Sequence, residues 1–170
     1  TPKYLLKRLE LLRIDSDTQH NLENLIPVFK EELDTIIRDF YDHITSFPEV
    51  AEIITSEAQV ASLRLKQKRH WIALFSCRFD EAYVESALRI GRIHYQHRVP
   101  PYLYIAGYNF FHCELIDALS RRHANTFELS HLLASVTRVI NLDMDLALSV
   151  YTREYWHEKD PKGSPHWLVD

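Results

Sequence analysis

The chain has 170 residues, of which 46% are hydrophobic and 26% charged, a composition typical of a globular domain with a substantial buried core. Its formal net charge of −4 gives no bulk attraction to nucleic acid or to anionic membranes, which argues against both as partners. The sequence has only three glycines and no apolar run near the roughly 18 residues that span a bilayer, so neither a turn-rich β fold nor a membrane protein is favoured.

Apolar residues recur every three or four positions from Asp15 to Ser46, as in amphipathic helices that bury one face. Pro27 interrupts this segment and is expected to separate two helices, and Pro48 is expected to end the second near Ser46. A short helical piece is expected over residues 49–54. The inward positions are Leu22, Leu25, Phe29, Leu33, Ile36, Ile37 and Phe40.

The middle of the chain is expected to form two more helices. Ser56 is a good N-cap residue, and the pattern that follows it predicts a helix over residues 57–76. A second helix is expected over residues 80–97, ending before Pro100 and Pro101. The expected inward positions are Val60, Leu63, Leu65, Trp71, Ile72, Leu74 and Phe75 in the first, and Tyr83, Val84, Ala87, Leu88, Ile90 and Ile93 in the second.

Two long helices are expected to complete the fold. Residues 102–122 are rich in aromatic side chains, and Thr126 with Glu128 predicts the start of a helix that ends near Trp156. The final segment, residues 159–170, breaks the helical pattern and is interpreted as a linker or tail. We therefore expect an all-α fold of about seven or eight helices, packed either as in globins or as a bundle.

Cys77 and Cys113 lie far apart within strongly helical sequence. Thiols in such positions usually serve as small buried hydrophobes and not as a disulfide framework. The cysteines therefore indicate a reducing compartment, and we expect a cytoplasmic protein.

Among ten histidines, His94 stands out because it lies on the apolar stripe of its helix, four residues after Ile90. His97 follows three residues later, a spacing that would also suit zinc if His112 and Cys113 supplied two more ligands. A carboxylate di-iron site would need the Glu-x-x-His pair on two helices, and it occurs once, at residues 154–157.

Tyr41 lies next to Phe40 on the expected core face of an earlier helix. It is either an ordinary buried tyrosine or a hydroxyl donor aimed at a polar ligand. Because Gly-x-Ser-x-Gly motifs and phosphate-binding glycine loops are absent from the sequence, the chain itself is not expected to be an enzyme.

Four segments, in order, resemble the sensor domain of globin-coupled sensors, which are haem-based gas sensors. The segment LRIGRIHYQHRVPPYLYIAGYNFF resembles the family's proximal region, in which an inward His, here His94, is followed by Pro101 and Tyr104. The segment LRLKQKRHWIALF resembles its distal helix, Phe40 and Tyr41 match its Phe-Tyr pair, and NLDMDLALSVY resembles its final helix.

This resemblance implies that the cofactor is haem b (iron protoporphyrin IX), that His94 is the proximal iron ligand, and that Tyr41 hydrogen-bonds a distal gas ligand, O2, NO or CO. It implies that haem-binding residues are Phe40, Leu63, Lys66, Gln67, Ile90 and Tyr104. Two residues depart from the family pattern. Lys66 would be costly to desolvate above a haem, so its stem is expected to extend outward, and His97 stands where relatives mostly have an apolar residue.

The resemblance also implies an organisation. Residues 1–158 would be the sensor domain, and residues 159–170 would lead to an output domain absent from this chain, such as a diguanylate cyclase or a histidine kinase. The last two helices would form a homodimer interface. A suitable apolar stripe consists of Leu132, Leu133, Val136, Val139, Ile140, Leu146 and Val150.

Two other functions compete with the sensor. One is a haem-free, globin-like helical module that mediates protein association. The other is a haem enzyme such as a nitric oxide dioxygenase, which would need an electron source, and the sequence contains no flavin or nicotinamide domain.

Overall fold

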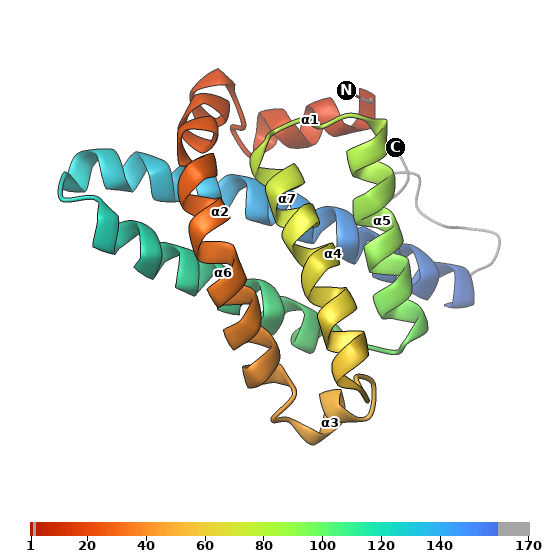
Figure 1. Ribbon diagram of the computed structural model, residues 1–170. Helices are drawn as coiled ribbons and strands as arrows, with labels where there is room; N and C mark the ends of the chain where they lie inside the picture. Colours follow the sequence, from red (N-terminus) through yellow and green to blue (C-terminus); the bar gives the residue numbers. More distant parts are fainter. Residues whose placement is uncertain (2, 160–170) are drawn as a thin grey trace.

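The computed structural model describes the backbone of residues 1 and 3–159 and the side chains of that part up to Thr152. Within this part every regular element is a helix, which confirms the all-α prediction (Figure 1). The helices are α1 (Lys3–Leu11), α2 (Ser16–Ile44), α3 (Pro48–Ala51), α4 (Glu57–Phe75), α5 (Glu81–Gln96), α6 (Pro101–Arg122) and α7 (Thr126–Lys159). The expected linker lies almost entirely outside the described residues.

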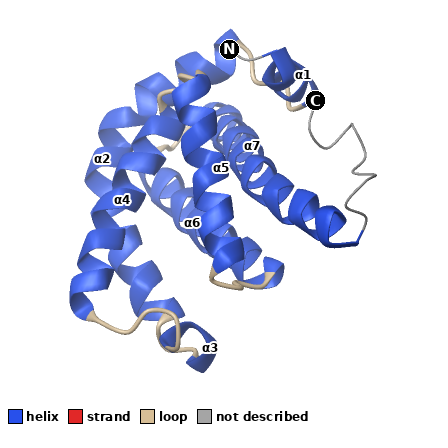
Figure 2. Ribbon diagram, turned by 90° about the vertical axis from the view of Figure 1, so that its right-hand side faces the viewer, coloured by secondary structure: helices blue, strands red, loops and turns tan. Residues whose placement is uncertain are grey.

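The helices form two layers that cross each other. In Figure 1 α2, α4 and α5 run steeply at the front, and α6 and α7 cross behind them. Figure 2 shows the same arrangement from the side, with α7 packed behind α5. A core of buried side chains from α2, α4, α5, α6 and α7 fills the space between the layers, so each helix buries only one face.

Helix starts follow the local sequence closely. The Ser56 hydroxyl accepts a hydrogen bond from the Gln59 backbone N–H at 3.2 Å, and Asp80 caps α5 by accepting from the Tyr83 N–H at 2.9 Å. Asp15 caps α2 in the same way through the Thr18 N–H at 2.9 Å. Each cap satisfies an N–H that the first helical turn leaves without an internal partner.

Pro27 does not separate two helices, so this prediction is wrong. It lies inside α2, which runs unbroken from Ser16 to Ile44. A proline inside a helix costs roughly 3 kcal/mol through a lost hydrogen bond and a steric clash. The long buried face around Pro27, with Leu22, Leu25 and Phe29 all at most 2% exposed, offsets that cost because a break would expose it.

Three other expectations on burial are wrong. Leu65 is 61% exposed and Ile93 is 46% exposed, although both were expected to face inward. Leu65 follows the half-buried Leu63, and Ile93 follows the buried Gly91, by two positions, which turns each side chain roughly to the opposite side of its helix. Cys113 is also exposed, whereas Cys77 is half-buried, and its burial raises the pKa of the thiol to about 12.

The apolar stripe of α7 serves the core of the chain itself. Leu132, Val136, Val139, Ile140, Leu146 and Val150 are each at most 6% exposed. Only Leu133 of the stripe is left half-buried. The prediction that this stripe faces a second subunit is therefore wrong, because α2, α4, α5 and α6 of the same chain pack against α7.

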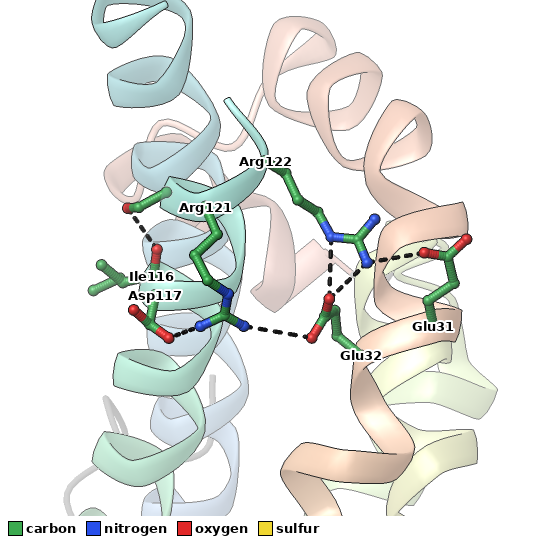
Figure 3. Close-up of polar contacts among 7 residues, drawn as sticks. Glu31, Glu32, Ile116, Asp117, Arg121 and Arg122 are labelled. Carbon is green, nitrogen blue, oxygen red and sulfur yellow. Dashed lines mark hydrogen bonds and ion pairs between the residues drawn. The ribbon is translucent and has the colours of Figure 1, made fainter. Parts of the chain in front are cut away.

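Ion pairs join the C-terminal end of α6 to the middle of α2 (Figure 3). Glu32 accepts from Arg122 at 2.6 Å and lies 3.8 Å from Arg121, which also pairs with Asp117 on its own helix. Arg122 also reaches Glu31 at 2.9 Å. These side chains are largely exposed, so the network orients the two helices more than it stabilises them.

Helices α5 and α7 approach each other closely at Gly91. A Cβ atom placed on Gly91 would lie 2.5 Å from the backbone oxygen of Ala147 and 3.0 Å from its Cα. Because these are backbone atoms of a packed helix, no rotamer change can relieve the contact. Gly91 therefore sets the distance between α7 and the helix that carries His94.

We predict that Gly91→Ala lowers the free energy of unfolding by about 1–3 kcal/mol, the usual cost of overpacking. Gly107→Ala is a matched control, because its Cβ would meet only the Phe40 ring at 3.5 Å, an ordinary contact. Alanine favours helix by about 1 kcal/mol over glycine, so Gly107→Ala is expected to be neutral or stabilising. Denaturant unfolding of both variants checks this, and equal effects would contradict the role given to Gly91.

Candidate functional site

His94 lies in the last turn of α5 with one ring nitrogen already occupied. Its Nδ1 is 2.8 Å from the carbonyl oxygen of Ile90, and because a carbonyl only accepts, Nδ1 carries the proton and donates. The lone pair therefore resides on Nε2. Burial lowers the pKa of His94 despite the opposing hydrogen bond to Ile90, so the ring is neutral. A neutral imidazole with its Nδ1–H fixed is the form in which histidine binds a metal.

Tyr104 holds the other side of the same imidazole. Its ring lies edge-on to His94, with ring centroids 4.6 Å apart and planes at 73°. Tyr104 is buried in the first turn of α6, and burial raises the pKa of its hydroxyl, which stays protonated. The hydroxyl oxygen lies 3.3 Å from that of Tyr108, one turn further along α6.

Phe40 and Tyr41 lie near the end of α2 and differ in their surroundings. Phe40 packs its ring against Phe110 and Phe111 of α6, at centroid distances of 5.7 and 4.9 Å. Tyr41 is only 4% exposed, yet none of the described residues hydrogen-bonds its hydroxyl. Burial raises the pKa of Tyr41, against the charge of nearby Arg64, so the phenol keeps its proton. Tyr41 therefore has a protonated hydroxyl with no hydrogen-bond partner among the described residues.

The face of α4 nearest to Tyr41 also has polar atoms without partners. The Oε1 atom of Gln67 and the Nε atom of Arg64 are buried and make no hydrogen bond. Leaving such an atom unpaired costs about 1–3 kcal/mol, so a cluster of them marks a place where a polar ligand fits. Leu63 is half-buried against the core, whereas Lys66 is exposed.

The arginine and lysine residues of α4 face carboxylates of α2 or solvent. Lys68 donates to Asp34 of α2 at 2.7 Å, and Arg64 lies 3.9 Å from Asp42. Arg69 is exposed. The Lys68 contact is an ion pair on a solvated face and not a contact to a ligand.

Asp143 is a residue of the site region that sequence reasoning missed. It is 2% exposed and accepts three hydrogen bonds, from Tyr83 at 2.6 Å, Tyr108 at 2.7 Å and His70 at 2.8 Å. Its position three residues after Ile140, on the apolar stripe of α7, was the available signal. A carboxylate at a buried position indicates that hydrogen-bond donors lie next to it in the core, because burying an unpaired charge is costly.

The electrostatics of Asp143 and His70 are coupled. Burial by itself would raise the pKa of Asp143, but the charge of His70 and the three hydrogen bonds hold it below its usual range. Burial likewise opposes the charged form of His70, and the neighbouring carboxylate nevertheless raises the pKa of this histidine. The two groups therefore form a buried ion pair with both tyrosines as further donors.

The structure brings some of the predicted residues together and keeps others apart. His94, Ile90 and Tyr104 form one group, and Phe40 and Tyr41 form another. Between His94 and Tyr41 the described residues show no hydrogen bond or ring contact. The imidazole of His94 on α5 and the hydroxyl of Tyr41 on α2 are therefore two separate polar groups.

The donor set fits a haem better than a protein-bound metal ion. Among the described residues no group of three or more His, Cys, Asp and Glu side chains is placed to hold a metal. His112 is engaged with Thr137 at 2.8 Å, and His97 is exposed and lines an open cleft beside α3, so neither shares the surroundings of His94. Haem needs only one axial imidazole and apolar walls, which the residues here supply.

Comparisons with known proteins agree with this geometry. The family model described as Protoglobin matches residues 2–157. The heme-based aerotactic transducer HemAT of Halobacterium salinarum (strain ATCC 700922 / JCM 11081 / NRC-1) is 26% identical over 158 residues, covering 87% of this chain and 32% of the transducer. The chain therefore spans about a third of that relative's length.

A solved structure has the same fold. The globin domain of the Geobacter sulfurreducens globin-coupled sensor superposes with a TM-score of 0.80, covering 86% of this chain and 96% of that domain, at 16% sequence identity. This confirms globin packing over a simple bundle and confirms the resemblance to globin-coupled sensors. Because the family match extends over nearly the whole chain, the chain belongs to the protoglobin family.

Proposed function

We propose that this chain is a gas-sensing globin domain in which His94 binds the iron of haem b and Tyr41 hydrogen-bonds a diatomic gas. The observation that carries the proposal is the His94 imidazole, which is neutral and directed through its Nδ1–H to the Ile90 carbonyl, with Nε2 left to bind iron. The Halobacterium relative is named a heme-based transducer, which supports haem as the cofactor.

When bound, haem supplies an iron atom with one position open to O2, NO or CO. Tyr41 then supplies a hydrogen bond from its hydroxyl, which has no partner among the described residues. Its raised pKa keeps it a donor at neutral pH. We assign the side-chain amide of Gln67 to the same side as Tyr41, as a second polar group. Its Oε1 is one of the buried atoms that make no hydrogen bond.

The apolar walls of the proposed pocket come from the two groups of residues already described. Phe40 and Leu63 line the side of Tyr41, and Ile90 and Tyr104 line the side of His94. Lys66, which is exposed, is placed to reach a haem propionate at the rim and not the gas. His97 is exposed at the end of α5 and is not proposed as a ligand.

As a sensor, the domain would pass the state of its ligand to a C-terminal output domain. The chain spans 32% of the Halobacterium transducer, which leaves room for such a domain in a longer protein. We propose residues 1–158 as the sensor, with an output such as a diguanylate cyclase or histidine kinase beyond residues 159–170, and no enzymatic activity in the sensor itself. The coupling requires about 1–3 kcal/mol of difference in gas affinity between the two output states.

We also propose a cytoplasmic location, on the basis of the free thiols. Over the described residues, no helix combines the length and the apolar character needed to cross a bilayer. The main rival is a haem-free helical module that mediates protein association, and haem binding separates the two.

The first test is the binding of haem. Wild-type protein reconstituted with haemin is expected to show a Soret band shifted from that of free haemin. His94→Ala is expected to lose that shift, because in the part of the chain that the structure describes no other imidazole donates its Nδ1–H to a carbonyl of its own helix. His97→Ala, which removes an exposed histidine three residues away, is the matched control and should retain the wild-type spectrum. A wild-type chain that leaves the haemin spectrum unchanged would favour the rival module.

The second test concerns Tyr41. Tyr41→Phe removes only the hydroxyl, so O2 should dissociate faster by roughly 2- to 12-fold, the effect of losing a hydrogen bond of about 0.5–1.5 kcal/mol. Stopped-flow or flash-photolysis measurements of the dissociation rate check this. Tyr102→Phe, at a position 63% exposed, is the control and should not change the rate. An unchanged rate in Tyr41→Phe would remove Tyr41 from the distal role.

The third test concerns the homodimer, which we propose forms through the outward faces of α6 and α7. These faces are apolar in part: Tyr102, Ile105 and Ile116 of α6 are 63%, 46% and 37% exposed and follow helical spacing, and Phe127 at the start of α7 is 74% exposed. We propose these faces as the interface in place of the apolar stripe of α7, which is buried in the core of the chain itself.

The double variant Ile105→Asp/Ile116→Asp is expected to shift the protein from dimer to monomer in sedimentation velocity, because both substitutions place charges within the apolar face. Leu65→Asp changes a leucine on α4 that is 61% exposed, more than either isoleucine, and should leave the dimer intact. Dissociation by Leu65→Asp but not by the double variant would move the interface to α4.

A further inference from the structure

The carboxylate of Asp143 joins four helices of the core. It belongs to α7 and receives His70 from α4, Tyr83 from α5 and Tyr108 from α6. A buried carboxylate is costly unless it is fully hydrogen-bonded, so each donor is held firmly. Only one of the three, Tyr108, leads on to the neighbourhood of His94.

The Asp143 carboxylate determines which hydroxyl donates and which accepts in the hydrogen bonds of Tyr108 and Tyr104. A carboxylate only accepts, so Tyr108 donates its single hydroxyl proton in the hydrogen bond to Asp143. The Tyr108 oxygen can then only accept from Tyr104, 3.3 Å away, and the Tyr104 proton is committed to Tyr108. Asparagine at position 143 would present N–H groups as well as an oxygen, and this order would be lost.

The end of the chain is the ring that contacts His94. The Tyr104 ring lies 4.6 Å from the His94 ring, and its only described hydroxyl partner is Tyr108. The imidazole thus has two constraints: its Nδ1 bond to Ile90 within α5, and the Tyr104 ring, whose position depends on α6 and α7. The second constraint connects His94 to another helix.

We propose that Asp143 is a positioning residue for His94, acting through Tyr108 and Tyr104, so that the orientation of the proximal imidazole depends on the position of α7. This rests on the proposed function, in which His94 binds haem iron. The branch through Tyr83 links α5 to α7 and makes no hydrogen bond to Tyr104, which gives the proposal an internal control.

The test measures the iron–histidine stretching band of the ferrous, gas-free, haem-loaded chain by resonance Raman spectroscopy. Asp143→Asn and Tyr108→Phe are each expected to shift the band in the same direction as Tyr104→Phe. The double variant Asp143→Asn/Tyr104→Phe should shift it no further than Tyr104→Phe alone, because both changes act along one chain.

Tyr83→Phe is the matched control, because it removes one hydrogen bond to the same carboxylate on the other branch. It should lower stability but leave the band at its wild-type position. A band unmoved in Tyr108→Phe, or moved equally by Tyr83→Phe, would overturn the proposal and assign the cluster a purely structural role.

The outcomes separate this proposal from the proposed function. If His94 is not the iron ligand, the band is absent in the wild type or survives in His94→Ala, and both proposals fail. If the band depends on His94 but is insensitive to Tyr108, only the role of Asp143 fails. Tyr108→Phe leaves Asp143 two donors, so the test does not depend on whether Asp143→Asn folds.

Discussion

The burial of one carboxylate organises this globin domain. Asp143 lies in the middle of α7 and is surrounded by apolar side chains, where an unpaired charge would not be tolerated. Its oxygens are satisfied only if α4, α5 and α6 each bring a donor to the same point. One acceptor therefore ties α4, α5 and α6 to α7, and these hydrogen bonds give a specific geometry to hydrophobic packing, which by itself is not directional.

The contact between α5 and α7 adds a steric constraint to this polar one. Gly91 lets the backbones meet at Ala147, and His94 follows it by three residues on the same helix. Tyr83, at the other end of α5, is held by Asp143. His94 therefore lies on a helix that is held against α7 at two places, by a backbone contact and by a hydrogen bond.

The two sides of the candidate site differ in how their polar groups are satisfied. Around His94, the ring Nδ1 and the hydroxyls of Tyr104 and Tyr108 are hydrogen-bonded, and only the ring Nε2 has no described partner. Around Tyr41, three polar atoms lack partners among the described residues: the Tyr41 hydroxyl, the Gln67 oxygen and the Arg64 Nε. The proposed assignment of an iron-binding side and a gas-binding side rests on this difference.

The sequence by itself determined what depends on neighbours along the chain. Periodicity and capping residues predicted the helices from α4 to α7 to within a few residues, and the stripe position of His94 predicted that it turns inward. Resemblance supplied Tyr41, which periodicity alone could not distinguish from an ordinary buried tyrosine. These features are local, because a cap or a helical face is defined within a few turns.

Only the tertiary structure decided what depends on contacts between distant segments. The buried face of α2 carries the helix through Pro27, and the other helices of the chain cover the apolar stripe of α7. Asp143 finds its donors on three helices that lie 35 to 73 residues away in sequence. No local pattern encodes such partners, because a buried charge is stable only once the elements that satisfy it have packed together.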